Sequence, residues 1–109
     1  MNILKYLFLF FLIFSLSNAK DLEPTFSLNT SGSVTDIVFN DNKLFVSTTA
    51  SSLDIFDIKT KEKIETIKIS KITDFTGNII ESKIYCVDVL KDNILLLSQG
   101  EKGGRSINI

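Results

Sequence analysis

Short apolar runs separated by polar turns dominate the chain from residue 34 onward. Val, Ile, Phe and Thr recur there at two-residue spacing or in runs of a few residues, which is typical of β-strands. The pattern predicts four strands, each ending at a polar or charged turn: 34–39, 43–49, 53–58 and 64–69. Because the turns between them are short, we expect neighbouring strands to pair antiparallel and to form one four-stranded unit over residues 34–69.

The second and fourth strands of this unit predict different places in a sheet. Residues 44–46 (Leu-Phe-Val) are apolar on both faces, as in a central strand. The fourth strand alternates, with Ile67 and Ile69 on one face and charged residues on the other. Charges discourage pairing with a further strand, so the fourth strand is expected at an outer edge.

A second stretch of the chain repeats the first. When the sequence is shifted by 51 places, residues 33–58 align with residues 84–109 without a gap, and the Asp-Asn turn at 41–42 falls on the one at 92–93. A repeat of this length, built from short strands, indicates stacked or radially arranged units. We therefore expect a partial second unit over residues 84–109.

Two segments fall outside the repeated units. Residues 20–33 contain the only proline and a cluster of Ser, Thr, Asn and Gly, so they are expected to form an irregular leader. Residues 70–83 form an insertion between the units, and insertions in repeat proteins often project from the binding face. Here Asp74, Phe75 and Asn78 are candidate partner contacts, with a turn at Thr76-Gly77. The alternative is that Phe75 packs against the neighbouring unit.

The N-terminus has the features of an export signal. Lys5 precedes an apolar run of eleven residues, 6–16, and the small residues Ser17 and Ala19 then fit a cleavage site before Lys20. We predict a helical signal peptide over residues 1–19 and a periplasmic mature chain. An uncleaved membrane helix is the alternative, although eleven residues fall short of the roughly 20 needed to span a bilayer.

Charge and cysteine content restrict the choice further. The chain has 12 Lys and Arg against 13 Asp and Glu, so it offers no basic surface for nucleic acid. Cys86 is the only cysteine, which excludes an internal disulfide. It lies in a strand-like run, so we expect it to be buried as a small apolar residue. A reactive or intermolecular thiol is the alternative.

No catalytic or metal-binding pattern is visible. Without histidine, the sequence does not support a zinc or haem site or a Ser-His-Asp triad. The glycine-rich stretch 100–104 lacks the Gly-Lys-Ser/Thr ending of a phosphate-binding loop and is expected to form a flexible connection. Four aspartates on or near strands raise the question of calcium, but their spacing favours bonds to backbone N–H groups instead: Asp36, Asp54, Asp57 and Asp88. We predict a non-enzymatic protein with no metal and no cofactor.

Residues 34–69 resemble a WD40-type β-propeller blade. The order of strand, Asp-containing turn, short strand, Ser-rich turn and strand is similar, and Phe56-Asp57 stands where that family has Trp-Asp. Residues 84–109 resemble a blade in part. The chain departs from the family because it has neither the Gly-His pair nor any tryptophan. The resemblance implies an all-β fold of about one and three-quarter propeller blades, an incomplete propeller, after the signal peptide.

A narrower resemblance implies a function. The export signal, blades without Gly-His and the segment 69–90 are similar to the NapL family, accessory proteins of the periplasmic nitrate reductase system. The resemblance implies an exported propeller scaffold that binds a protein partner, a component of that system. It carries over no functional residue.

The length of the chain leaves two alternative functions open. Propellers close with roughly four to eight blades, so we expect the chain to be a truncated form or to assemble with copies of itself. One alternative function is that of a propeller enzyme whose active site lies in missing blades. Another is a membrane-tethered β-domain that keeps its N-terminal anchor.

Overall fold

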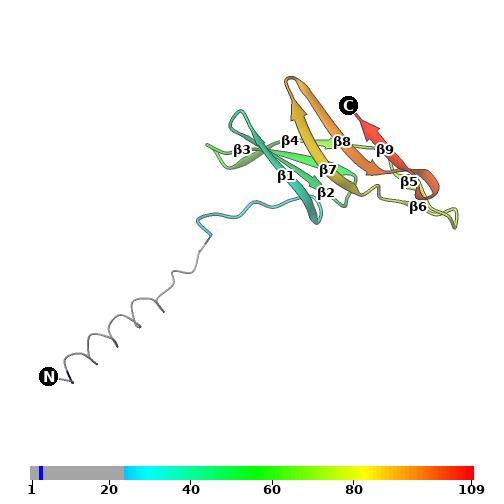
Figure 1. Cartoon of the computed structure of the whole chain (residues 1–109), viewed down its shortest axis with the longest axis horizontal. Helices are drawn as coiled ribbons and strands as arrows, with labels where there is room; N and C mark the ends of the chain where they lie inside the picture. Colours follow the sequence, from blue (N-terminus) through cyan, green and yellow to red (C-terminus); the bar gives the residue numbers. More distant parts are fainter. Residues whose placement is uncertain (1–2, 4–23) are drawn as a thin grey trace.

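The computed structural model describes residue 3 and residues 24–109, and the latter fold as antiparallel β-sheet (Figure 1). The prediction of an all-β fold is confirmed for residues 24–109. The predicted signal peptide over residues 1–19, with Ser17, Ala19 and Lys20 at its cleavage site, lies outside the described residues. In the part of the chain that is described, no helix has the length and apolar character required to cross a membrane.

The first sheet is a four-stranded meander in the order β1-β2-β3-β4, as predicted. Its strands are β1 (Val34–Asn40), β2 (Lys43–Thr48), β3 (Ser52–Asp57) and β4 (Glu62–Lys68). The β1–β2 turn holds Asp41 at φ 50° and Asn42 at φ 60°. Asp and Asn tolerate this left-handed conformation better than most residues, which is why a two-residue hairpin forms here.

The second sheet has three strands in the order β7-β8-β9. These are β7 (Ile84–Leu90), β8 (Asn93–Gln99) and β9 (Arg105–Asn108), and a short 3₁₀ turn, η1 (Glu101–Gly103), joins the last two. The predicted flexible connection over 100–104 is therefore an ordered turn. The Gly100 N–H donates to the Gly104 carbonyl at 2.8 Å, and the Gly104 N–H donates to Glu101 O at 2.9 Å.

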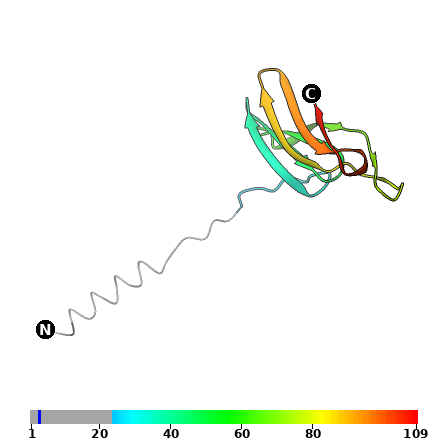
Figure 2. The same cartoon turned by 45° about the vertical axis from the view of Figure 1, so that its right-hand side comes forward.

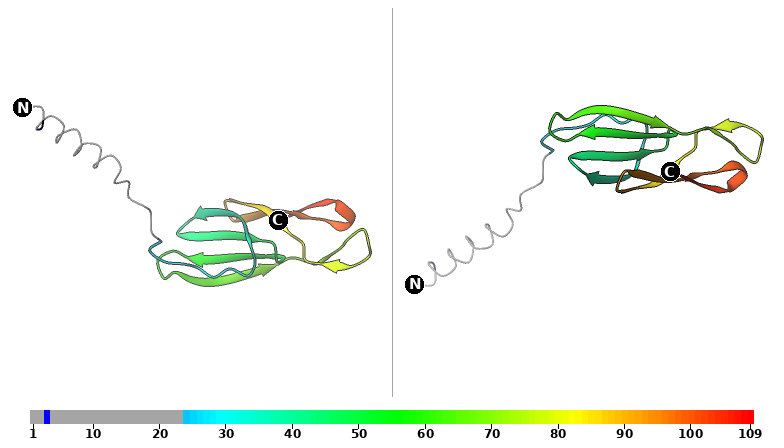
Figure 3. Two further views of the ribbon diagram at one scale, coloured as in Figure 1. Left: turned by 90° about the horizontal axis from the view of Figure 1, so that it is seen from below. Right: turned by 90° about the horizontal axis from the view of Figure 1, so that it is seen from above.

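A small hairpin separates the two sheets along the chain. Within the predicted insertion 70–83, β5 (Ile72–Thr73) pairs with β6 (Ile79–Ile80). Figure 3 shows this hairpin projecting beyond the first sheet, at the same end of the molecule as the β8–β9 connection.

The two sheets begin with hairpins of the same build, fifty residues apart. Val34 pairs with Thr48 and Ile84 with Ser98, and each hairpin has a bulge directly after the first of these residues. The offset of 51 is therefore wrong by one residue in this hairpin. The Asp-Asn identity favoured 51, but both two-residue turns lie fifty apart, at 41–42 and 91–92. The β8–β9 connection is also longer than its β2–β3 counterpart, so no single offset covers the third strand.

The two sheets pack face to face around one apolar core. β7 lies beside β1 and β2 (Figures 1 and 2), and both sheets supply buried side chains to the layer between them. Each such side chain contributes about 1.5–3 kcal/mol through its removal from water. The buried members are Phe45, Leu53, Ile55, Ile84, Val87 and Leu96.

Polar bonds fix the position of the second sheet on the first. The Thr35 hydroxyl donates to the Ile84 carbonyl at 2.5 Å, and the Val87 N–H donates to Asp36 Oδ2 at 3.1 Å. Ser82 N–H donates to the Ser51 hydroxyl at 2.6 Å. A bulge displaces its strand from regular pairing and leaves a residue unpaired, and on β7 the bulge lies next to these contacts.

The other face of the first sheet is partly covered by the leader. Residues 24–33 contain no strand, as predicted, and Figure 3 shows them crossing this sheet. Asp54 is fully buried beneath them: its carboxylate accepts the Ser31 N–H at 2.6 Å, the Ser31 hydroxyl at 2.7 Å and the Thr66 hydroxyl at 2.9 Å. Burial acts to raise the pKa of Asp54, but these hydrogen bonds and Lys63 outweigh it and hold the pKa below its usual value.

Cys86 is exposed, so the expectation that it is buried is wrong. The cause is the bulge between Ile84 and the paired residues that follow it. The bulge directs Val87 into the core and places Cys86 opposite Leu97, on the face of the second sheet that is turned away from the first.

Candidate functional site

The three predicted partner contacts lie together in the turn of the β5–β6 hairpin, residues 74–78, here called the hairpin tip. Asp74 Oδ1 accepts hydrogen bonds from the Thr76 N–H at 2.9 Å, the Thr76 hydroxyl at 2.6 Å and the Asn78 N–H at 3.0 Å. Gly77 has φ +88°, which confirms the turn predicted at Thr76-Gly77. The tip is therefore an ordered turn held by its own side chains.

These bonds also set the charge of the tip. The Thr76 hydroxyl, followed by the Asn78 backbone N–H, holds the pKa of Asp74 below its usual value. The carboxylate is stabilised in its charged form because all three bonds donate to it. The tip consequently presents a fixed negative charge next to an aromatic ring.

Phe75 is the most prominent side chain of the tip. It is 81% exposed, although an aromatic ring of this size is usually found buried. The ring also lies against η1, since a Cβ built on Gly103 would be only 2.6 Å from Phe75 Cζ. Phe75 thus packs on η1, the connection between β8 and β9, and presents most of its surface to solvent. Its position is compatible with both predictions, contact with a partner and packing on the neighbouring unit.

The hairpin is anchored at its base as well. The Thr73 N–H donates to Glu101 Oε2 at 2.7 Å, which joins β5 to η1. The Arg105 guanidinium, which donates to the Gly103 and Gly104 carbonyls, also lies over the Tyr85 ring, 4.9 Å from its centroid. The tip, η1 and the start of β9 therefore form one end of the molecule, here called the tip surface.

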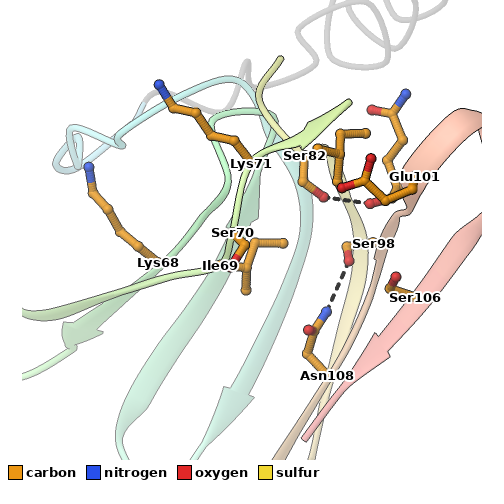
Figure 4. A pocket seen from close by; sticks show the side chains of 11 residues that line it. Lys68, Ile69, Ser70, Lys71, Ser82, Ser98, Glu101, Ser106 and Asn108 are labelled. Carbon is orange, nitrogen blue, oxygen red and sulfur yellow. Dashed lines mark hydrogen bonds between the residues drawn. The ribbon is translucent and has the colours of Figure 1, made fainter. Parts of the chain in front are cut away.

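A polar cleft of about 410 Å³ adjoins this surface (Figure 4). Its walls come from the end of β4 and the residues after it, from Ser82, and from β8, η1 and β9. Two hydrogen bonds fix the inner wall: the Ser82 hydroxyl donates to Gln99 O at 2.7 Å, and Asn108 Nδ2 donates to the Ser98 hydroxyl at 2.9 Å. Sequence reasoning missed this cleft.

The two lysines of the cleft do not converge on its polar wall. In Figure 4 the Lys68 and Lys71 side chains extend away from Ser98 and Asn108. Lys71 instead lies 3.4 Å from the Glu81 carboxylate. The cleft offers hydroxyl and amide groups as hydrogen-bond partners for a polar ligand.

The four aspartates considered for metal binding are dispersed. As predicted, Asp36, Asp57 and Asp88 each accept a backbone N–H, and Asp57 closes the β3–β4 turn through the N–H groups of Lys59 and Thr60 at 2.8 and 3.0 Å. Within residues 24–109, His, Cys, Asp and Glu side chains form no group of three that could hold a metal ion.

A comparison of the chain with protein-family models, with curated proteins and with solved structures finds no match.

Proposed function

We propose that the chain is an exported, non-enzymatic scaffold of WD40-like propeller blades, and that it binds a protein partner through the tip surface. The observation that carries this proposal is Phe75: a ring 81% exposed on a turn fixed by three hydrogen bonds to Asp74. Aromatic side chains that bury on association dominate the energetics of many interfaces, and a rigid turn loses little entropy when it binds.

Further exposed groups surround this ring. Ile79 is largely exposed on β6, and Lys102 extends the surface on η1. An apolar centre rimmed by charges is typical of protein interfaces. The resemblance to the NapL family supplies the candidate partner, which is a component of the periplasmic nitrate reductase system.

Biolayer interferometry tests the proposal with the purified, immobilised chain and purified subunits of a periplasmic nitrate reductase. We expect saturable binding to one subunit, weakened about tenfold or more by Phe75→Ala, which corresponds to about 1.4 kcal/mol. Gly103→Ala moves the Phe75 ring without removing it, so it should weaken binding by a smaller factor.

Phe26→Ala is the matched control. Phe26 is also an exposed phenylalanine, but it lies by Lys61 in the turn before β4, at the other end of the first sheet from the tip surface. Its removal should leave binding unchanged. Absence of binding to every subunit, or equal losses for Phe75→Ala and Phe26→Ala, would refute the proposal.

A further inference from the structure

Within residues 24–109, nothing covers the face of the second sheet that is turned away from the first, and this face is mainly apolar although Asp88 lies opposite Leu95. On the side turned away from the first sheet, Cys86 lies opposite Leu97, and Leu97 in turn lies opposite Ile107. Ile107 is 72% exposed. Leu95 belongs to the same face because it is two residues from Leu97 on β8. We call these four residues the open face.

The open face corresponds to a face that is covered in the first sheet. Fifty residues earlier, Ser47 stands at the place of Leu97 and Phe45 at the place of Leu95. Leu53 pairs with Ser47 as Ile107 pairs with Leu97. Phe45 and Leu53 are buried under β7 and β8, so the molecule itself shows what covers a face of this build: the face of another such sheet.

The first sheet carries the matching surface. Val87 and Val89, which cover the first sheet, correspond to Ile37 and Phe39 on β1. These two share one face because they lie two residues apart on β1, where they pair with Val46 and Leu44 of β2. Ile37 is 57% and Phe39 62% exposed, whereas Val87 is almost fully buried. We call this pair the β1 strip.

The leader leaves the strip accessible. The described part of the leader, residues 24–33, crosses the same face as the strip, but it contacts Asp54, Lys61 and Lys63 on and between β3 and β4, and Ala50 after β2, rather than β1. Two apolar surfaces are therefore left uncovered by the residues that the structure describes. They correspond to the two surfaces that pack together between the first and second sheets.

We propose that the open face of one copy of this chain docks on the β1 strip of a second copy, which repeats the internal packing of β7 on β1 between molecules. Such a contact joins two different surfaces, so it produces a closed ring or an open chain of copies. With two sheets per copy, closure at roughly four to eight sheets takes about two to four copies. This self-association uses neither Phe75 nor the tip surface, so it stands or falls separately from partner binding.

Two aspartate substitutions, one on each of the two surfaces, test which surfaces make the contact. Ile37→Asp places a charge on the β1 strip, and Ile107→Asp places one on the open face. Because both positions are exposed, each variant should fold and keep the circular dichroism spectrum of the unsubstituted chain. Multi-angle light scattering of the full-length gene product, with reducing agent present, should give an oligomer for the unsubstituted chain. Each variant alone should be a monomer.

A mixture of the two variants is the decisive measurement. Each variant keeps the surface that the other lacks, so the mixture should form a one-to-one dimer that cannot grow. Cys86 lies on the open face, so its alkylation by iodoacetamide should be slower in the unsubstituted oligomer than in the Ile37→Asp monomer. The control Ile79→Asp changes an equally exposed isoleucine on β6 and should leave the oligomer intact.

Three results would overturn the proposal. The first is an unsubstituted chain that stays monomeric across the micromolar range. The second is an oligomer that survives both Ile37→Asp and Ile107→Asp, which would place its contact elsewhere. The third is a mixture of the two variants that remains monomeric, because a contact between two identical surfaces cannot be restored by mixing.

Discussion

The first sheet is covered on one face by the second sheet and on part of the other face by residues 24–33, whereas the described residues cover only one face of the second sheet. The opening hairpins of the two sheets have the same strand pairing, turn length and bulge position. Their third strands nevertheless differ greatly: residues 52–56 of β3 are all buried, but residues 105–107 of β9 are all exposed. The difference shows that the hairpin pattern determines the shape of a sheet, while its place in the stack determines which side chains are buried.

The largest expected effect comes from equivalent residues on the two third strands. Leu53→Ala removes a side chain with no exposed surface from the core and should lower the free energy of unfolding by about 2–5 kcal/mol, because it leaves a cavity. Ile107→Ala, at the matching place in the second sheet, should lower it by less than about 0.5 kcal/mol. Urea titrations followed by circular dichroism, at a dilution where the chain is monomeric, measure both. Equal losses would mean that the second sheet's far face is covered within one chain.

A smaller effect concerns the polar contact under the leader. In the second sheet Asn108 takes the place of Asp54, because it pairs with Leu96 as Asp54 pairs with Val46. Asp54→Asn therefore makes the first sheet resemble the second and weakens the bonds from Ser31. We expect the free energy of unfolding to fall by about 1.5–3 kcal/mol at neutral pH, as for the loss of hydrogen bonds to a charged group.

The pH dependence of this loss has a definite sign. The pKa of Asp54 is lowered in the folded chain, so its contribution to stability is fully present above the unfolded value, about 3.9. The contribution disappears as the pH falls through the lowered folded pKa. Urea titrations should show Asp54→Asn less stable than the parent at pH 7, with the difference shrinking below about pH 4. A difference that grows on acidification would contradict this account.

The strands and turns of this chain could be predicted from sequence because their signals are local. The alternation around Ile67 and Ile69 placed β4 at the edge, and Asp74 with Gly77 marked the turn of the hairpin tip. The offset between the hairpins could not be predicted in this way. The Asp-Asn pairs lie 51 apart, whereas the pairing of the strands depends on a bulge and a two-residue turn that identities do not encode.

The polar cleft could not be predicted for a different reason. Its walls join residues 68–72, at and after the end of β4, to Ser98 and Asn108 of the second sheet, and these walls meet only after the second sheet has packed on the first. The spacing of these residues carries no signal, and Ser and Asn are common in turns. The wrong prediction for Cys86 has a local cause, because the bulge directly before this residue changed the face of β7 on which it lies.

The smallest expected effect lies at that cysteine and compares two neighbouring residues of β7. Cys86→Ser replaces an exposed thiol with a similar polar group, so the free energy of unfolding should change by less than about 0.5 kcal/mol. In the dilute monomer the Cys86 thiol should react with a thiol reagent without unfolding. When Val87→Cys is added to Cys86→Ser, the new thiol lies in the core and should react only as fast as the sheets separate. Rapid labelling at position 87 with protection at position 86 would mean that the two faces of the second sheet are assigned the wrong way round, and the assignment of the open face would then be wrong.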